Sequence, residues 1–297
     1  MSDSIRQEIT KTIIETLTTG DLPPWRKPWA CDPNSPGLHT SLSSQKPYRG
    51  INQLILMCSA MKNNFRSKWW ATFNQIKQQG GSVTKGSKAT TVVLYRPIER
   101  TKVNEKGKEV DDSFFVMRSF KIFNSDQTTL EQFQVSDEPV EGVPFESYEQ
   151  ADQLIEDIGA DIRYGGDEAF YNSKEDFIQL PHHGKFDSPE AFYETAFHEH
   201  AHYTEHESRL NWDRKNEGNS YCMGELIAEL SSVLLMAELG LPVTQNLENH
   251  AAYLKHWLKG MEGDPKFIFK VSSHANRSVD WLLACRRQNA MAEPTIA

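Results

Sequence analysis

One predicted helix, residues 189 to 206, constrains this chain most because it repeats histidine at helical spacing. It contains the pattern His-Glu-His-Ala-His at residues 198 to 202. Residues four apart lie one turn apart on one helix face, so the imidazoles of His198 and His202 can reach a single metal ion. Glu199 lies about 100° around the helix from His198, beside such an ion. Ser188 and Pro189 form an N-cap and first-position pair that predicts where the helix begins.

This histidine and glutamate spacing matches the His-Glu-x-x-His pattern of zinc metallopeptidases. In such sites the metal lowers the pKa of a bound water to about 7, and the glutamate accepts the proton of that water. We therefore interpret His198 and His202 as ligands of Zn²⁺, or of another divalent ion such as Mn²⁺, and Glu199 as the catalytic general base. The sequence predicts a metal-dependent peptidase site.

A catalytic zinc site also needs a third protein ligand and an open position for water. The stretch from 221 to 236 is predicted to be a strongly apolar helix, yet Glu225 and Glu229 lie one turn apart on one of its faces. Burying these carboxylates would be costly without a cation. We expect one of them to bind the metal and the other to accept the ring N–H of a ligating histidine. Spacing leaves both assignments open, and two solvent-facing glutamates remain the alternative.

Further polar residues are candidates for supporting roles at this site. His206 continues the histidine face by one turn and could approach the metal or a substrate oxygen, and His200 could recruit a second ion. A developing oxyanion needs hydrogen-bond donors nearby. The candidates for this role are Tyr203, Arg209, Tyr221 and His250.

The charged side chains divide the chain into two unlike parts. Residues 1 to 128 contain 19 basic and 11 acidic side chains, whereas residues 129 to 297 contain 13 basic and 30 acidic ones. We therefore expect two domains with different partners, at residues 1–130 and 148–297, joined by a linker at 131–147 that is rich in Asp, Glu, Pro and Val. Helical and strand patterns occur in both parts, which predicts an α+β fold.

The basic part mixes aromatic and cationic side chains, as in Trp25-Arg26-Lys27-Pro28-Trp29. Rings can stack on unpaired bases, contributing about 1–3 kcal/mol each, while cations meet phosphates. The alternative is that the tryptophans cover the edge of a core. We interpret the following residues as contacts to single-stranded DNA: Trp25, Arg26, Lys27, Trp29, Lys46, Tyr48, Arg49, Arg66, Lys68, Trp69, Trp70, Lys85 and Lys88.

Local patterns predict most elements of this part. We expect a helix over 3–19, a second helix ending near residue 61, a short helix that begins after Thr72, and strands over 91–96 and 113–124. Residues 101–112 are polar without a period, which predicts an exposed loop. In the acidic part we expect a helix over 148–158 and two or three short strands within 161–181.

The sequence shows none of the patterns that predict export or insertion into a membrane. The four cysteines form no Cys-x-x-Cys pair, no apolar run reaches the length of a membrane span, and the beginning of the chain shows no signal-peptide pattern. We expect a cytoplasmic protein with reduced thiols and no membrane partner.

Several collinear blocks resemble one known family. Residues 24–29, 48–52, 70–75, 80–86 and 116–127 resemble the N-terminal single-stranded-DNA-binding domain of ArdC-type antirestriction proteins, which also occurs in plasmid TraC-type primases. Residues 176–181, 198–202, 207–210 and 225–229 are similar to the zincin-type domain that follows it in ArdC proteins. The resemblance covers most of residues 3 to 240.

The resemblance implies a fold and a function. It implies binding of single-stranded DNA with little sequence preference, a gluzincin-like metallopeptidase domain, and protection of incoming plasmid DNA from host restriction during conjugation. The location would be the cytoplasm of the cell receiving the DNA, and host restriction components are candidate protein substrates. The strand over 176–180 would be the sheet edge that pairs with a peptide. Two alternatives remain: a non-enzymatic DNA shield with a structural or vestigial metal, and an acidic DNA mimic that binds restriction enzymes directly.

Overall fold

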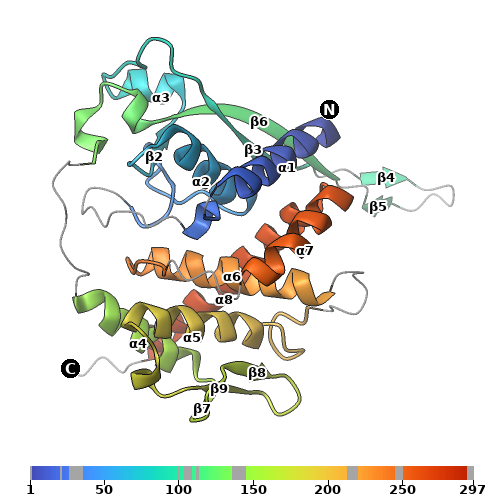
Figure 1. The fold of residues 1–297 in the computed structure, drawn as a ribbon. Helices are drawn as coiled ribbons and strands as arrows, with labels where there is room; N and C mark the ends of the chain where they lie inside the picture. Colours follow the sequence, from blue (N-terminus) through green and yellow to red (C-terminus); the bar gives the residue numbers. More distant parts are fainter. Residues whose placement is uncertain are drawn as a thin grey trace.

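The computed structural model describes residues 2–20, 22–26, 36–98, 101–103, 109–111, 114–135, 145–212, 220–244 and 250–292. Helices and strands are mixed throughout them, which confirms the α+β class (Figure 1). The α-helices are α1 (Ser2–Thr19), α2 (Ile51–Asn63), α3 (Phe73–Gln78), α4 (Phe145–Ile158), α5 (Pro189–Tyr203), α6 (Ser220–Glu238), α7 (His250–Gly263) and α8 (Phe267–Ala292). The 3-10 turns are η1 (Pro24–Arg26), η2 (Ser125–Gln127), η3 (Glu131–Phe133) and η4 (His183–Lys185). The strands are β1 (Thr40–Ser41), β2 (Trp69–Ala71), β3 (Thr90–Ile98), β4 (Thr101–Val103), β5 (Glu109–Asp111), β6 (Phe114–Asn124), β7 (Asp161–Tyr164), β8 (Phe170–Asn172) and β9 (Phe177–Leu180).

The N-terminal part is organised by a four-stranded sheet in the order β1-β2-β6-β3. Strands β3 and β6 pair antiparallel from Thr90↔Ile122 to Ile98↔Phe114. Helix α3 begins as predicted, because Thr72 and Gln75 form a capping box at its N-terminus. The predicted loop over 101–112 is wrong in part, since β4 and β5 pair there as a short hairpin. Threonine and valine in these segments favour extended backbone.

The acidic part combines a small three-stranded sheet with helices α4 to α8, and it lies mostly below the first sheet in Figure 1. Its strand order is β7-β9-β8. Strand β9, predicted to be the sheet edge, is therefore the central strand, and this prediction is wrong. The reason is burial: Phe177, Ile178 and Leu180 are 7%, 0% and 0% exposed, and a strand buried in this way needs partners on both sides.

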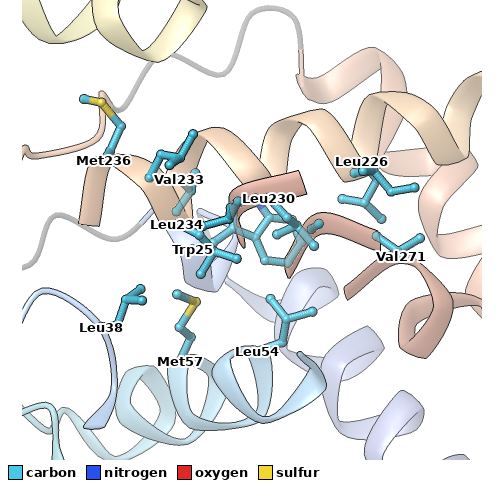
Figure 2. Packing of buried hydrophobic residues seen from close by; sticks show 14 of the residues in the cluster. Trp25, Leu38, Leu54, Met57, Leu226, Leu230, Val233, Leu234, Met236 and Val271 are labelled. Atoms are coloured by element: carbon cyan, nitrogen blue, oxygen red, sulfur yellow. The ribbon is translucent and has the colours of Figure 1, made fainter. Parts of the chain in front are cut away.

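One hydrophobic core connects the two parts of the molecule. Trp25 of η1 lies between Leu54 and Met57 of α2 and Leu230 and Leu234 of α6 (Figure 2). Helix α2 also contacts α8, and α1 contacts α7. Of the predicted linker 131–147, residues 131–133 form η3 and residues 145–147 begin α4, while 136–144 lie outside the described residues. The two charge-defined parts thus share buried apolar surface.

Within the described ranges, none of the helices has the length and apolarity needed to cross a membrane.

Candidate metal centre and nucleic-acid surface

Helices α5 and α6 pack side by side and bring three donor groups together. His198 and His202 lie one turn apart on α5, with ring centroids 4.9 Å apart. The Nε2 atoms of both rings lie 3.6 Å from the carboxylate of Glu225 on α6. The three donor atoms lie within 4.8 Å of one another. Two imidazoles and one carboxylate converging in this way fit one divalent cation with an open fourth position.

The geometry separates the two glutamates that spacing could not distinguish. Glu225 faces both imidazoles, and its side chain is 14% exposed. Glu229 is 2% exposed and binds Arg26 of η1, whose Nε and Nη2 donate to its carboxylate at 2.6 and 2.7 Å. Trp25 Nε1 donates to the same carboxylate at 3.2 Å. The structure therefore favours Glu225 as the third ligand.

We expected the orienting carboxylate to be Glu225 or Glu229, but the carboxylate next to Nδ1 of His202 is that of Glu205. Its Oε1 lies 3.1 Å from Nδ1 of His202. A carboxylate bound to one ring nitrogen fixes the tautomer and directs the other nitrogen at the metal. Sequence analysis missed this residue, although its spacing of three from His202, at the end of α5, was an available signal.

The surroundings of the histidines are strongly acidic. Burial lowers the pKa of His198, but the hydrogen bond that its ring donates to Glu225 and the charges of Glu199, Glu225 and Glu229 raise it, so that the pKa lies above its ordinary value. The same negative surroundings favour a bound cation. His200 differs, because burial lowers its pKa to about 4 and its Nδ1 lies 2.6 Å from the carbonyl oxygen of Ala196. Its side chain is fully buried and does not line the cleft next to His198 and His202, so the structure does not support a second ion at His200.

An open cleft contains the three donor groups and Glu199. One flank of this cleft is β8, an outer strand of the small sheet, with Phe170 and Tyr171 among the lining residues. Tyr221 and Tyr253 line it as well, and their hydroxyl oxygens are 3.1 Å apart. The phenol of Tyr221, which is 60% exposed, is available to a ligand in the cleft.

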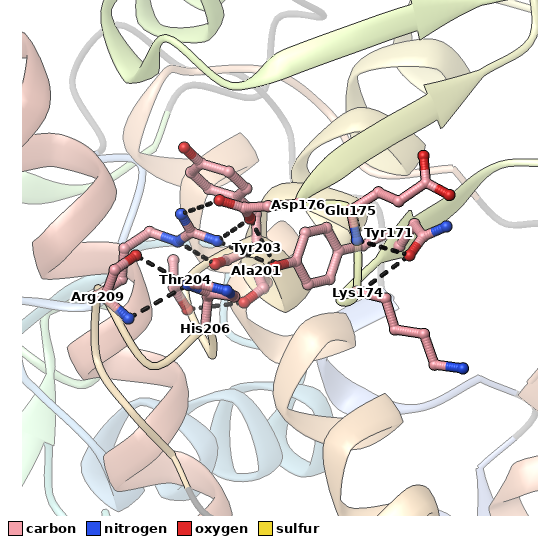
Figure 3. Close-up of polar contacts among 11 residues, drawn as sticks. Tyr171, Lys174, Glu175, Asp176, Ala201, Tyr203, Thr204, His206 and Arg209 are labelled. Carbon is pink, nitrogen blue, oxygen red and sulfur yellow. Dashed lines mark hydrogen bonds and ion pairs between the residues drawn. The ribbon is translucent and has the colours of Figure 1, made fainter.

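Other predicted oxyanion donors have different positions. Tyr203 is buried against Trp281. The guanidinium of Arg209 donates to Asp176, Tyr171 and the carbonyl of Tyr203 (Figure 3). These two assignments are wrong because both side chains are committed to packing and hydrogen bonds.

Two histidine candidates remain to be placed. His206 lines the cleft, with Nδ1 2.8 Å from the hydroxyl of Ser208. It is not part of the convergent group of three donor atoms. His250 begins α7, and its side chain lies outside the described residues.

Comparisons with known proteins place these features in a family. A model of the zincin-like metallopeptidase family MPTase-PolyVal matches residues 149–274, and a model of the N-terminal domain of the anti-restriction factor ArdC matches residues 3–123. The crystal structure of metal-free antirestriction protein ArdC from plasmid R388 is 33% identical, with a TM-score of 0.77 over 95% of this chain and 98% of that chain. This chain belongs to the ArdC antirestriction family. The resemblance seen in the sequence is thereby confirmed.

Two further relatives of this ArdC family member are informative. The Mn(II)-bound structure of R388 ArdC is 32% identical, with a TM-score of 0.74 over 95% of this chain and 97% of that chain. A DNA primase TraC of Escherichia coli is 32% identical over 97% of this chain, but the chain spans 28% of the length of that primase. A divalent metal fits both the family and the donor set described above.

The ArdC N-terminal region buries several residues that we interpreted as DNA contacts. Trp25, Arg26, Lys68 and Trp70 are 1%, 3%, 9% and 0% exposed, so their assignment to a DNA surface is wrong for this structure. Trp70 Nε1 lies 3.0 Å from His39 Nδ1, and Lys68 donates to the carbonyl of Gly37. Aromatic and basic residues at close spacing also occur in a buried, hydrogen-bonded core. The sequence pattern therefore could not distinguish a DNA-binding surface from such a core.

The other candidates within the described residues are nearer the surface. Tyr48 and Trp69 are partly buried, Trp69 against Phe133. Lys27 and Trp29 lie outside the described residues. The exposed candidates are Lys46, Arg49, Arg66, Lys85 and Lys88.

The β3–β6 ribbon exposes an aromatic and basic face that sequence analysis did not single out. Leu94 and Phe120 are 51% and 42% exposed. Leu94 pairs with Arg118, and Phe120 follows Arg118 by two residues on β6, which places these three exposed side chains on one face of the ribbon. Val92, which pairs with Phe120, is buried. The signal was the period-two spacing of Arg118 and Phe120 on a predicted strand.

Proposed function

We propose that this ArdC family member binds single-stranded DNA and acts as a metal-dependent peptidase, protecting incoming plasmid DNA from restriction in the cell that receives it by conjugation. The observation that carries the proposal is the convergence of His198, His202 and Glu225 beside Glu199 in one open cleft. The zincin-like match and the antirestriction relatives support it.

His198, His202 and Glu225 would hold the cation, and Zn²⁺ suits this donor set best. Mn²⁺ is the second candidate, because a structure of R388 ArdC is Mn(II)-bound. When bound, the cation would acidify a water molecule and polarise the carbonyl of a peptide bond. Glu205 keeps the His202 ring oriented for that purpose through the contact at Nδ1.

The remaining chemistry belongs to residues of the cleft. Glu199 would take a proton from the attacking water and deliver it to the leaving amine. The outer edge of β8 offers backbone groups to an extended peptide, which could bind as an added strand. The exposed phenol of Tyr221 could donate to the oxyanion that develops on the carbonyl oxygen.

Substitution of Glu199 tests the peptidase. We expect the purified protein with Zn²⁺ or Mn²⁺ to cleave a host restriction component, and Glu199→Gln to reduce the rate about 10²–10⁴-fold. Glu156→Gln, at an exposed position on α4, is the matched control and should keep wild-type activity. Addition of a chelator should abolish cleavage.

Two results would contradict the proposed role of Glu199. Equal cleavage by the Glu199→Gln protein would remove the general base from the mechanism. Full protection of transferred DNA by that variant would favour the non-enzymatic shield.

The DNA-binding half of the proposal rests on the exposed face of the β3–β6 ribbon. Phe120 can stack on a base, and Arg118 can meet a phosphate. We expect Phe120→Ala to weaken binding of a single-stranded oligonucleotide about tenfold, because one stacked base is worth about 1–3 kcal/mol. Tyr164→Ala is the control, since Tyr164 is 46% exposed on β7 of the acidic part. Fluorescence anisotropy at fixed salt measures both, and unchanged affinity of Phe120→Ala would exclude this face.

A further inference from the structure

Arg26 connects the N-terminal region to the two helices that carry the donor groups. Its Nε and Nη2 donate to the two carboxylate oxygens of Glu229 at 2.6 and 2.7 Å. Its Nη1 forms an ion pair with Glu194. The three residues are 3%, 2% and 7% exposed, respectively. A single guanidinium is thus buried between two carboxylates from different helices.

The two carboxylates occupy matching positions next to the donor groups. Glu194 precedes His198 by one turn on α5, and Glu229 follows Glu225 by one turn on α6. Arg26, Glu194 and Glu229 also line the cleft that contains the donor groups. The guanidinium therefore spans α5 and α6 one turn away from the place where they hold the donors.

Neighbouring contacts fix this arrangement. The carbonyl of Thr244 accepts from Arg26 Nη1 at 3.4 Å, and the amide of Thr244 donates to Glu194 Oε2 at 2.9 Å. Trp25 adds a hydrogen bond to Glu229 and packs against Trp257 at a ring-centroid distance of 6.4 Å. Arginine suits this place because its planar fork binds a carboxylate through two parallel hydrogen bonds.

Removal of the guanidinium would leave two carboxylates buried without their cation. Such groups repel each other and attract water, and breaking a buried ion pair is strongly destabilising. A wider separation of α5 and α6 would reduce the repulsion between these two carboxylates and admit water to them. A metal site tolerates displacements of only about 0.5 Å, so a wider separation would draw Glu225 away from the histidines.

We propose that Arg26 is a positioning residue of the metal centre, holding α5 and α6 at the separation at which His198, His202 and Glu225 converge. This inference rests on the metal centre of the proposed function, but it is independent of peptidase activity. It also links the DNA-binding region to the peptidase region, because Arg26 lies in the segment matched by the ArdC N-terminal model.

Substitution of Arg26 removes both a positive charge and a positioning contact, and these two losses should change the metal affinity in opposite directions. A guanidinium near a cation repels it, so the loss of one positive charge alone would tighten metal binding. Loss of a positioning contact weakens metal binding, by about 10–100-fold for partners that orient ligands. The sign of the change therefore identifies which effect dominates.

The experiment measures the Zn²⁺ affinity of the full chain by competition with a chromophoric chelator, and the visible absorption of the Co²⁺-substituted protein. We expect Arg26→Gln to weaken Zn²⁺ binding about 10–100-fold and to change the Co²⁺ spectrum. Arg26→Lys should recover part of the loss, because its ammonium can still contact the carboxylates of Glu194 or Glu229, although it lacks the planar fork. Arg277→Gln, at an exposed position on α8, should behave as wild type.

A second variant covers the case in which Arg26→Gln does not fold. The double substitution Arg26→Met and Glu229→Met removes one charge of each sign and leaves Glu194 bound to the amide of Thr244, so net charge is kept while the contact between helices is lost. It should also bind Zn²⁺ more weakly than wild type. Wild-type affinity and Co²⁺ spectrum in both variants, or tighter binding by Arg26→Gln, would overturn the proposal.

The same measurements distinguish failure of this inference from failure of the proposed function. A wild-type chain that binds Zn²⁺ but cleaves no protein contradicts the peptidase and leaves the role of Arg26 intact. A wild-type chain that binds no better than His198→Ala has no metal centre at these residues, and both proposals then fall.

Discussion

Arg209 shows how a side chain outside the cleft can support its wall. The guanidinium donates to Asp176 Oδ2 at 3.0 Å and to the hydroxyl of Tyr171 at 3.0 Å, and it lies over the ring of Tyr203 at 3.5 Å. Tyr171 belongs to β8, and Asp176 belongs to the turn before β9. The contacts therefore connect the segment after α5 to the strand that flanks the cleft.

The Asp176 carboxylate should stabilise the folded protein at neutral pH and lose this effect at acidic pH. Hydrogen bonds from Arg209 are the largest cause that lowers the pKa of Asp176 to about 2, against about 3.9 in an unfolded chain. Its contribution is therefore present above about pH 4 and is lost as the pH falls toward 2. We expect the difference in urea midpoint between wild type and Asp176→Asn to be constant from neutral pH to about pH 5 and to shrink below pH 4.

Asparagine is the suitable replacement at this position. Residue 176 has φ of 57°, and asparagine tolerates this left-handed conformation well. Backbone strain therefore should not contribute to the comparison. A difference in midpoint that stayed the same down to pH 2 would show that the carboxylate charge has no part in it.

Residues close in sequence were predictable, and residues brought together by the fold were not. His198, Glu199 and His202 follow from helical spacing alone. The choice between Glu225 and Glu229 depends on Arg26, which is 203 residues away from Glu229. Local patterns contain no information on that contact. Trp25 and Arg26 were misassigned for the same reason.

At the scale of elements, α5 begins where its capping residues predict. The hydroxyl of Ser188 accepts from the amide of Ala191 at 3.2 Å, and Pro189 occupies the first helical turn. Such signals act within a few residues, so sequence reveals them. The central position of β9 could not be predicted, because strand order depends on pairing between segments.

Removal of this cap should weaken the protein measurably. We expect Ser188→Ala to lower the free energy of unfolding by about 1 kcal/mol, because one amide of the first turn loses its acceptor. Urea denaturation followed by far-UV circular dichroism measures the change. Ser43→Ala, at an exposed turn position, should alter stability by less than about 0.5 kcal/mol. Equal effects of the two substitutions would contradict the capping role.

At the scale of the whole molecule, charge suggested two domains with different partners, and the packing shows that the two charge-defined parts share buried apolar surface. The basic part contributes Trp25, Leu54 and Met57 to a cluster completed by Leu230 and Leu234 of the acidic part. Net charge could not reveal this contact, because one of the counted cations, Arg26, is buried between acids of the other part.

A substitution in the basic part should therefore destabilise both parts together. Leu54 is 3% exposed, and truncation of a buried leucine to alanine costs about 2–5 kcal/mol. We expect Leu54→Ala to unfold in one transition at lower urea, with coincident curves from tryptophan fluorescence and far-UV circular dichroism. Two separated transitions would show that the parts fold independently.

The buried guanidinium of Arg26 also restricts how genes of this kind can recombine. A gene fusion that supplied the zincin-like region with a foreign N-terminal partner would leave Glu194 and Glu229 facing each other, unless the new partner brought an arginine to the same place. Inheritance of the two regions as one unit avoids that difficulty. The TraC primase of Escherichia coli is similar over 97% of this chain, which spans 28% of the length of that primase, so the similar stretch of that longer polypeptide extends over both regions.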